Sequence, residues 1–266
     1  MSFADSVIVI TGASSGIGRA LAAELAVEKP RLALAARTEQ HLQEAATECR
    51  QLGAEVLVVP TDVTSQEQCR ALIEQTVEHF GRLDVLINNA GRAMWAAVDE
   101  IDDPSVFDEL MQVNYLGSVY CTHAALPHLK SSRGLIVVMS SASGLTGVPM
   151  LSGYAATKHA LFGFFESLRI ELSGSGVDVT ILAPDFVQSE ILARATDAEG
   201  QQLGAIPPGL GKLLPVDKCA RRIVRAIRKR KRLMLTSERS AWARWGKLVA
   251  PGLTDRISAW AIGQRR

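Results

Sequence analysis

The sequence has few cysteines and no long apolar run, and each absence excludes a class of protein. The four cysteines, at positions 49, 69, 121 and 219, are widely scattered. This spacing argues against a CxxC metal site or a dense disulfide framework and favours buried, reduced thiols. No apolar run approaches the roughly 20 residues that cross a bilayer, and no basic stretch typical of a signal peptide precedes Ser6. We therefore expect a cytoplasmic protein.

The chain also lacks a linker, an internal repeat and a pattern of metal ligands. Hydrophobic residues make up 47% of the 266 residues and are spread evenly, so residues 1–266 are expected to form a single domain with a substantial core. Within it, we expect residues 190–215 to form a substrate flap and residues 236–266 a helical C-terminal extension. The histidines are isolated from one another, and no metal is expected.

Charge is divided sharply along the chain. Residues 1–211 hold 13 basic and 25 acidic residues, a net charge of −12, whereas residues 212–266 hold 16 basic and 3 acidic residues, a net charge of +13. Such asymmetry is typical of a segment that binds nucleic acid or anionic lipid. Pairing of the two parts within one chain or between subunits explains it equally well.

Short apolar runs rich in β-branched residues alternate with longer stretches of helical periodicity. The runs cover residues 7–10, 32–36, 55–59, 84–87, 135–139 and 177–182. The helical stretches include residues 18–28, 39–52 and 65–80. This alternation predicts an α/β fold with a single, doubly wound Rossmann-type parallel sheet that helices cover on both faces. In such a sheet ligands bind beyond the carboxyl ends of the strands.

A glycine-rich turn follows the first predicted strand and leads into a helix expected to begin near Arg19. Glycine lets the backbone turn tightly and approach a pyrophosphate, while free N–H groups at a helix N-terminus attract negative charge. The spacing GxxxGxG at this position predicts a dinucleotide site. Its candidate residues are Gly12, Ser14, Ser15, Gly16, Ile17 and Gly18.

The end of the second predicted strand indicates which dinucleotide binds. An NAD-selective enzyme usually carries an acidic residue there, which holds the ribose 2′-hydroxyl. This chain has Arg37, followed by Thr38 and Glu39. A guanidinium pairs well with a 2′-phosphate. We therefore expect NADP(H) as the preferred cofactor, with NAD(H) as the alternative that Glu39 keeps open.

Tyr154 and Lys158 are separated by four positions near the start of a long helical stretch. That spacing places both side chains on one helical face. A phenol with a pKa of about 10 is a poor acid or base at neutral pH, but a nearby ammonium favours the phenolate. The pair is thus a candidate proton donor and its tuning cation.

With these motifs, the chain strongly resembles the short-chain dehydrogenase/reductase family from about Ser6 to Ser189. The glycine-rich loop, Asn88–Gly91, Asn114, Ser140–Ser141 and the tyrosine and lysine occur in the family's order, with Tyr154 thirteen positions after Ser141. The resemblance implies an NADP(H)-dependent oxidoreductase that transfers a hydride between the nicotinamide and a carbonyl or alcohol carbon. The alternative is a non-catalytic NADP(H)-sensing or scaffolding module.

The resemblance also implies roles for individual residues. Tyr154 would exchange the proton, Ser141 would hydrogen-bond the substrate oxygen in preference to Ser140, Lys158 would hold the nicotinamide ribose, and Asn114 would support a proton path. Further cofactor contacts would come from Asp62, Val63, Asn89, Ala90, Gly91, Pro184, Val187 and Ser189. One departure is visible, because the family usually has Pro-Gly where this chain has Pro184-Asp185.

Loops after strands four, five and six bind the substrate in this family, and here they are largely apolar. We therefore expect a lipophilic ketone, aldehyde or alcohol as the small-molecule substrate. Packing of the mobile flap is the alternative role for these side chains. Together with Ser141 and Tyr154, the candidate residues are Met94, Trp95, Leu145, Met150, Leu151, Phe186 and Ile191.

The C-terminal part combines a basic run at residues 225–232 with apolar residues at helical spacing. The apolar residues are Trp242, Trp245, Leu248, Val249, Leu253, Ile257 and Trp260. This profile is also that of a helix lying in a membrane interface. We favour docking on the acidic body or on a neighbouring subunit, since members of the family are often homodimers or homotetramers. No nucleic acid partner is expected, because the tail alone is weak evidence for one.

Overall fold

The chain folds around one parallel sheet. The computed structural model describes residues 2–207, 210 and 213–263. The sheet has seven strands in the order β3-β2-β1-β4-β5-β6-β9, and all neighbouring strands are parallel. The strands are β1 (Val7–Thr11), β2 (Arg31–Ala36), β3 (Glu55–Pro60), β4 (Val85–Asn88), β5 (Leu135–Met139), β6 (Asp178–Ala183) and β9 (Leu233–Leu235). The predicted doubly wound α/β fold is confirmed.

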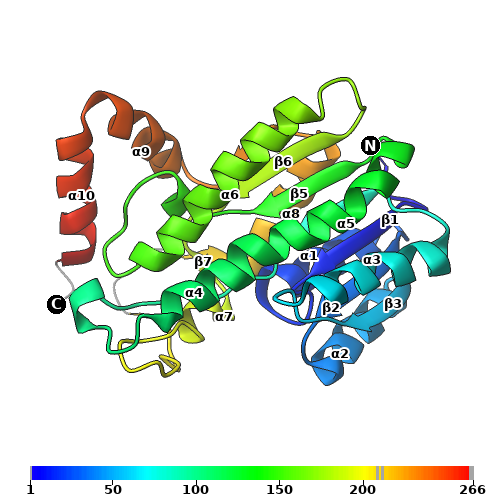
Figure 1. The fold of residues 1–266 in the computed structure, drawn as a ribbon, viewed down its shortest axis with the longest axis horizontal. Helices are drawn as coiled ribbons and strands as arrows, with labels where there is room; N and C mark the ends of the chain where they lie inside the picture. The colour runs from blue at the N-terminus through cyan, green and yellow to red at the C-terminus, as the bar shows by residue number, and fades with distance from the viewer. Residues whose placement is uncertain (1, 208–209, 211–212, 264–266) are drawn as a thin grey trace.

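Helices cover both faces of the sheet (Figure 1), and alternate residues of β1 enter separate hydrophobic cores on these two faces. Ile8 and Ile10 pack in one core, with α1 (Gly16–Ala26), α2 (Glu39–Gln51) and α8 (Val216–Arg228). Val7 and Val9 pack in the other, with α3 (Gln66–Phe80), α5 (Gly117–Ser132) and α6 (Ser152–Glu171). Burial on both faces explains why the strands are continuous apolar runs instead of alternating ones.

The basic run belongs to the body of the domain. Residues 225–232 cover the end of α8 and the turn into β9. Arg228 forms an ion pair with Glu28, and Arg230 forms one with Asp178 at 2.8 Å. Part of the basic segment therefore pairs with acidic residues of the same chain. This agrees with charge pairing between the two parts, as opposed to binding of nucleic acid or anionic lipid.

The segments expected to form the flap and the extension have little sheet structure. In and around the flap lie β7 (Val187–Gln188), α7 (Glu190–Ala193) and β8 (Leu214–Pro215), with residues 208, 209, 211 and 212 outside the described residues. The extension forms α9 (Glu238–Val249) and α10 (Pro251–Gly263), and its residues 264–266 lie outside the described part. Both helices lie at one end of the molecule, far from β3 (Figure 1). Among the described helices, none is both long and apolar enough to span a bilayer.

Candidate active site

The glycine-rich segment that runs from the end of β1 into the first turn of α1 leaves no room for side chains at two positions. Gly12 has a φ of +66°, and a Cβ there would lie 2.8 Å from Ala90 Cα. A Cβ on Gly18 would lie 2.2 Å from the Gly12 carbonyl oxygen. α1 begins at Gly16, so the expected start near Arg19 was placed too late in the chain. No side chain caps its first N–H groups, which leaves them for a phosphate.

Asn89 fixes this loop to the end of β4. Its Nδ2 donates to the carbonyl oxygens of Thr11, at 2.9 Å, and Gly12, at 3.2 Å. Thr11 Oγ1 accepts hydrogen bonds in return from the backbone N–H groups of Asn89, at 3.0 Å, and Ala90, at 3.1 Å. The Asn89 amide therefore serves to position the loop, while Ala90 and Gly91 line the cavity beside it.

Arg37, Asp62 and Val63, which the sequence suggests as contacts for the adenosine half of the cofactor, line the same cavity. Arg37 is exposed and pairs with none of the carboxylates in the described part of the chain. Asp62 Oδ1 accepts from Thr64 N–H and Thr64 Oγ1, both at 2.9 Å, which holds the loop after β3. A free guanidinium at this point can bind a 2′-phosphate without first breaking an ion pair.

Asn114 lies in a π-helical turn, Gln112–Leu116, between α4 (Ser105–Met111) and α5. Its Oδ1 accepts from Arg92 N–H at 2.8 Å, and its Nδ2 donates to the Arg92 carbonyl oxygen at 3.0 Å and to Thr157 Oγ1 at 2.9 Å. Such turns occur frequently at functional sites. The buried amide is thus held rigidly in place.

Gly91 brings Asn114 close to the lysine. A Cβ at Gly91 would lie 3.1 Å from Asn114 Oδ1 and 3.6 Å from Lys158 Nζ. Both polar groups therefore border the space that a side chain at this position would fill. A proton relay needs such proximity.

The two serines after β5 have different partners. Ser140 Oγ donates to the backbone carbonyl of Lys158 at 3.0 Å, so its proton is already used. Ser141 Oγ accepts from Ser143 N–H at 3.3 Å and from Ser143 Oγ at 2.9 Å, which leaves its own proton for Tyr154 or a substrate oxygen. This arrangement supports Ser141 as the substrate-facing serine.

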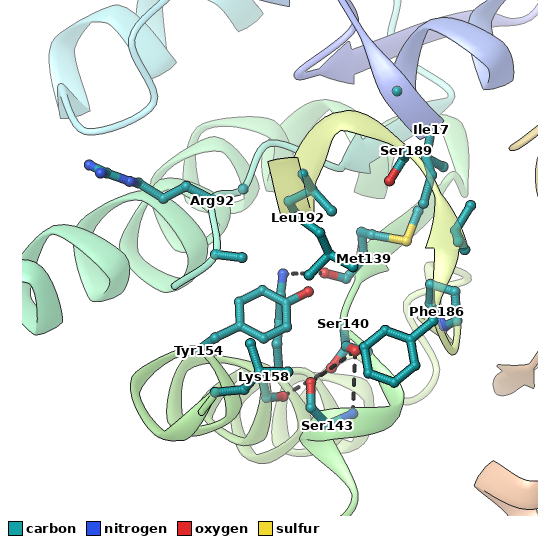
Figure 2. A pocket seen from close by; sticks show the side chains of 18 of the residues that line it. Ile17, Arg92, Met139, Ser140, Ser143, Tyr154, Lys158, Phe186, Ser189 and Leu192 are labelled. Atoms are coloured by element: carbon teal, nitrogen blue, oxygen red, sulfur yellow. Dashed lines mark hydrogen bonds between the residues drawn. The ribbon is translucent and has the colours of Figure 1, made fainter. Parts of the chain in front are cut away.

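Tyr154 and Lys158 stand in the first two turns of α6, and the tyrosine hydroxyl points into the cavity (Figure 2). Lys158 Nζ donates to the Met139 carbonyl oxygen at 2.9 Å and lies 5.4 Å from the centroid of the tyrosine ring. The side chain of Arg92, by contrast, points away from the tyrosine hydroxyl (Figure 2). The expected juxtaposition of phenol and amine is present.

The pKa shifts of this pair differ from the sequence-based expectation. Burial raises the pKa of Tyr154 to about 12, and a hydrogen bond from Ser141 opposes that rise. Burial also lowers the pKa of Lys158 to about 7. The reason is that both groups are desolvated, which disfavours phenolate and ammonium alike. In the protein alone, the lysine thus does not bring the tyrosine pKa below its usual value.

One cavity of about 990 Å³ joins the glycine-rich loop, the tyrosine and the C-terminal helices. Of the apolar residues expected around the substrate, Leu151, Phe186 and Ile191 line it. The other four do not line it, and they are Met94, Trp95, Leu145 and Met150. Met94 is buried in a small separate core, and Leu145 packs against one of the main cores. Apolar character alone could not distinguish these positions from pocket positions.

Several lining residues were not identified from the sequence. Arg194 reaches from the flap to the glycine-rich loop, where Nη1 donates to Ser15 Oγ at 3.3 Å. His41 lies beside Arg37 along the cavity, and α9 and α10 form part of its wall. None of these carries a motif, since only the fold brings them together. Pro184, Val187 and Ser189 line the cavity as expected.

Comparison with known proteins agrees with the geometry. The family described as short chain dehydrogenase matches residues 6–200. The chain belongs to the short-chain dehydrogenase/reductase family. It is accordingly an oxidoreductase of alcohol and carbonyl groups, and the family binds NAD(P).

Two curated plant relatives are about two fifths identical to this chain over the residues that align. The chain is 41% identical to 11-beta-hydroxysteroid dehydrogenase A of Sesamum indicum over 263 residues, which are 96% of this chain and 74% of that protein. It is 40% identical to 11-beta-hydroxysteroid dehydrogenase 1A of Arabidopsis thaliana over 85% of this chain and 66% of the Arabidopsis protein. The chain is therefore shorter than these relatives.

Solved structures show the same fold with either dinucleotide. A short-chain dehydrogenase/reductase from Burkholderia phymatum in complex with NAD has a TM-score of 0.84 and 27% identity, covering 95% of this chain and 96% of that one. An alcohol dehydrogenase from Thermococcus sibiricus complexed with 5-hydroxy-NADP has a TM-score of 0.74 and 30% identity, covering 87% of this chain and 95% of the other. The choice between NAD and NADP is thus left to residues of the chain itself.

Proposed function

We propose that this short-chain dehydrogenase/reductase uses NADP(H) to interconvert a lipophilic ketone or aldehyde and its alcohol. The observation that carries the proposal is the cavity that places the tyrosine hydroxyl, the Ser141 hydroxyl and a glycine-rich phosphate loop along one continuous wall. The crowded backbone at Gly12 and Gly18, together with the uncapped start of α1, fits a dinucleotide pyrophosphate. When bound, the dinucleotide supplies or accepts the hydride.

The protein side chains handle the substrate oxygen and its proton. Ser141 donates a hydrogen bond to the carbonyl oxygen, and Tyr154 gives that oxygen a proton as the carbon is reduced. A tyrosine with a pKa raised to about 12 stays protonated at neutral pH, which is the state that reduction requires. The ammonium form of Lys158, which lies against the ring, stabilises the phenolate left behind.

Arg37 supports the preference for NADP(H). It lines the cavity, and its guanidinium forms no ion pair with the described carboxylates. Glu39, which kept NAD(H) open as an alternative, is exposed and is not among the lining residues. A bidentate contact from Arg37 to a 2′-phosphate would favour NADP(H) over NAD(H).

The apolar cavity wall supports a bulky lipophilic substrate. Leu151, Phe186, Leu192, Leu253 and Ile257 line the same cavity as the tyrosine. Burial of apolar substrate surface against such a wall would supply most of the binding free energy. The names of the relatives add a specific direction, since a four-ring steroid ketone has the size and character this wall suits.

A substrate screen tests the proposal. Purified protein is mixed with NADPH or NADH and with ketones that range from small keto acids to an 11-ketosteroid, and cofactor oxidation is followed by absorbance. We expect turnover of lipophilic ketones with NADPH and none with the Tyr154→Phe variant. Faster turnover of charged keto acids would contradict the substrate class. Equal activity of Tyr154→Phe would contradict the mechanism and favour a cofactor-sensing or scaffolding module.

We also infer that a second copy of the chain covers the apolar side of α9. Trp242, Trp245, Leu248 and Val249 are 61 to 84% exposed, and large exposed apolar patches commonly mark protein interfaces. Light scattering should show a homodimer or homotetramer in the wild type and a smaller species in Trp245→Glu. Unchanged mass for Trp245→Glu, together with its loss of binding to anionic vesicles, would instead assign this surface to a membrane.

We propose that the protein is located in the cytoplasm.

A further inference from the structure

The C-terminal helices form one wall of the substrate end of the cavity. Trp242 and Gly246 from α9 line it, together with Leu253 and Ile257 from α10. The two helices pack closely, because a Cβ on Gly246 would lie 2.9 Å from Thr254 Oγ1. α10 therefore moves with α9, and the position of this wall depends on how α9 is attached to the body.

Asp185 provides that attachment. It follows β6 at the position where the family usually has glycine, and its side chain is 15% exposed. The carboxylate accepts two hydrogen bonds from Arg239 Nη2, at 2.7 and 2.9 Å, and one from Arg239 Nε at 3.1 Å. It also accepts from Ser237 Oγ at 2.8 Å and from Phe186 N–H at 3.0 Å. Both Ser237 and Arg239 belong to the start of α9.

These contacts fix the orientation of α9 as well as its distance from Asp185. A guanidinium that binds a carboxylate through a planar fork allows little rotation. Ser237 caps α9, accepting from Ser240 N–H at 3.1 Å, while Asp185 N–H donates to Thr236 Oγ1 at 2.8 Å. Asp185 therefore binds two successive residues that lead into α9, Thr236 through its backbone N–H and Ser237 through its carboxylate.

The same contacts reach the substrate wall directly. The Arg239 guanidinium carbon lies 5.8 Å from the centroid of Phe186, a residue that lines the cavity. Asp185 is not among the residues with a positive φ, so it does not replace glycine for a backbone reason. What aspartate adds at this position is the carboxylate and its partners.

We propose that Asp185 is a positioning residue for substrate selectivity, which acts through Arg239 to hold α9 and α10 as a fixed apolar wall of the substrate site. Because these residues all line one cavity, we expect a bulky ketone whose oxygen sits between Ser141 and Tyr154 to contact that wall. A small ketone is held by the two hydroxyls alone. Selectivity for large substrates therefore depends on the ion pair, whereas the chemical step does not. The inference rests on the function proposed above.

Steady-state kinetics with two probes test this role. The variants are Asp185→Asn, Arg239→Gln and their double substitution, each assayed with NADPH against an 11-ketosteroid and against cyclohexanone. Each single variant replaces the charged, forked contact by a weaker neutral one, so we expect KM for the steroid to rise about tenfold. For cyclohexanone, KM should stay within about twofold. The double variant should be no worse than either single one, because coupled residues are not additive.

Three controls separate positioning from damage to the fold. Arg244→Gln removes another arginine of α9. Arg244 contacts the ring of Trp245 and forms no ion pair among the described residues, so KM for the steroid should match that of the wild type. Arg239→Lys keeps the charge without the fork and should fall between wild type and Arg239→Gln. NADPH affinity, measured by fluorescence titration, should be unchanged in all variants.

The outcomes distinguish this inference from the proposed function. Wild-type protein that reduces neither probe overturns the proposed function. Wild-type protein that reduces both, with variants that lose the two probes equally or lose neither, overturns the role of Asp185 alone. Wild-type protein that reduces only cyclohexanone also overturns the role of Asp185, because the enzyme then has no preference for large substrates that this residue could support.

Discussion

Lys158 lies against the face of Tyr154, with its Nζ 5.4 Å from the ring centroid, and its hydrogen bond goes to the Met139 carbonyl instead of the tyrosine hydroxyl. The amine can therefore influence the phenol through space without being a proton acceptor for it. The tyrosine hydroxyl keeps one side for Ser141 and the other for the cavity. Proton transfer to a substrate then needs no rearrangement of the lysine.

Replacing Tyr154 by phenylalanine removes the hydroxyl and keeps the ring. We expect ketone reduction to fall by a factor of about 100 or more, since a positioned general acid contributes on that order, while NADPH binding is retained. Stopped assays of product and fluorescence titration of NADPH measure the two properties separately. Turnover that is lost together with NADPH binding would mean that the ring or its surroundings, and not the proton, had been disturbed.

The rate of reduction should depend on the charge of Lys158. Burial lowers its pKa to about 7, so the amine is charged below that pH and neutral above it. We expect kcat/KM to fall as pH rises through about 7, because a neutral amine no longer stabilises the phenolate. Lys158→Met should be slow at every pH and lack this transition. A wild-type profile that is flat between about pH 6 and 8 would contradict the assignment.

Exchange of Arg37 for aspartate should change the choice of cofactor. A carboxylate there repels a 2′-phosphate and accepts from a ribose hydroxyl, so we expect the NADPH to NADH ratio of kcat/KM to fall by about 100-fold. Arg70→Asp is the matched control, since Arg70 is an exposed arginine of α3 outside the cavity lining. An equal ratio in the two variants would remove Arg37 from the cofactor site.

Alanine substitution of Gly18 tests the glycine-rich loop, and alanine substitution of Gly163 in α6 is the control. Gly18→Ala places a Cβ 2.2 Å from the Gly12 carbonyl, so we expect a weaker affinity for NADPH and a lower melting temperature. Gly163→Ala meets no atom within 4 Å in α6, so we expect it to stabilise the protein by about 0.5 to 1 kcal/mol. Calorimetry and NADPH titration compare the two. A Gly18→Ala protein that binds NADPH normally would show that the loop relaxes.

Local patterns were sufficient where chemistry depends on sequence spacing. The segment from Gly12 to Gly18, Arg37 after β2, and the pair of Tyr154 and Lys158 on α6 were all singled out from the sequence, and all contribute to the lining of one cavity. Each is attached to the end of a strand or the start of a helix. Since parallel strands end at the same edge of the sheet, their positions follow from the order of the elements.

The edge strand β9 could not be predicted in this way. Its three residues, Leu233–Leu235, follow a run of five basic residues and carry no periodic signal. They become a strand because Met234 pairs with Leu182 of β6. Likewise, Met94 and Leu151 are both apolar loop residues, but only Leu151 lines the cavity.

The amino-acid sequence by itself determined the fold class and predicted a phosphate loop and a set of reacting groups, because these depend on short-range spacing and on the side chains present. The tertiary structure alone decided how strongly each group is desolvated, which apolar residues reach the cavity, and that Asp185 meets Arg239. Those properties arise between residues far apart in the chain. Burial and long-range contact are set by packing of the whole domain, and no local pattern contains them.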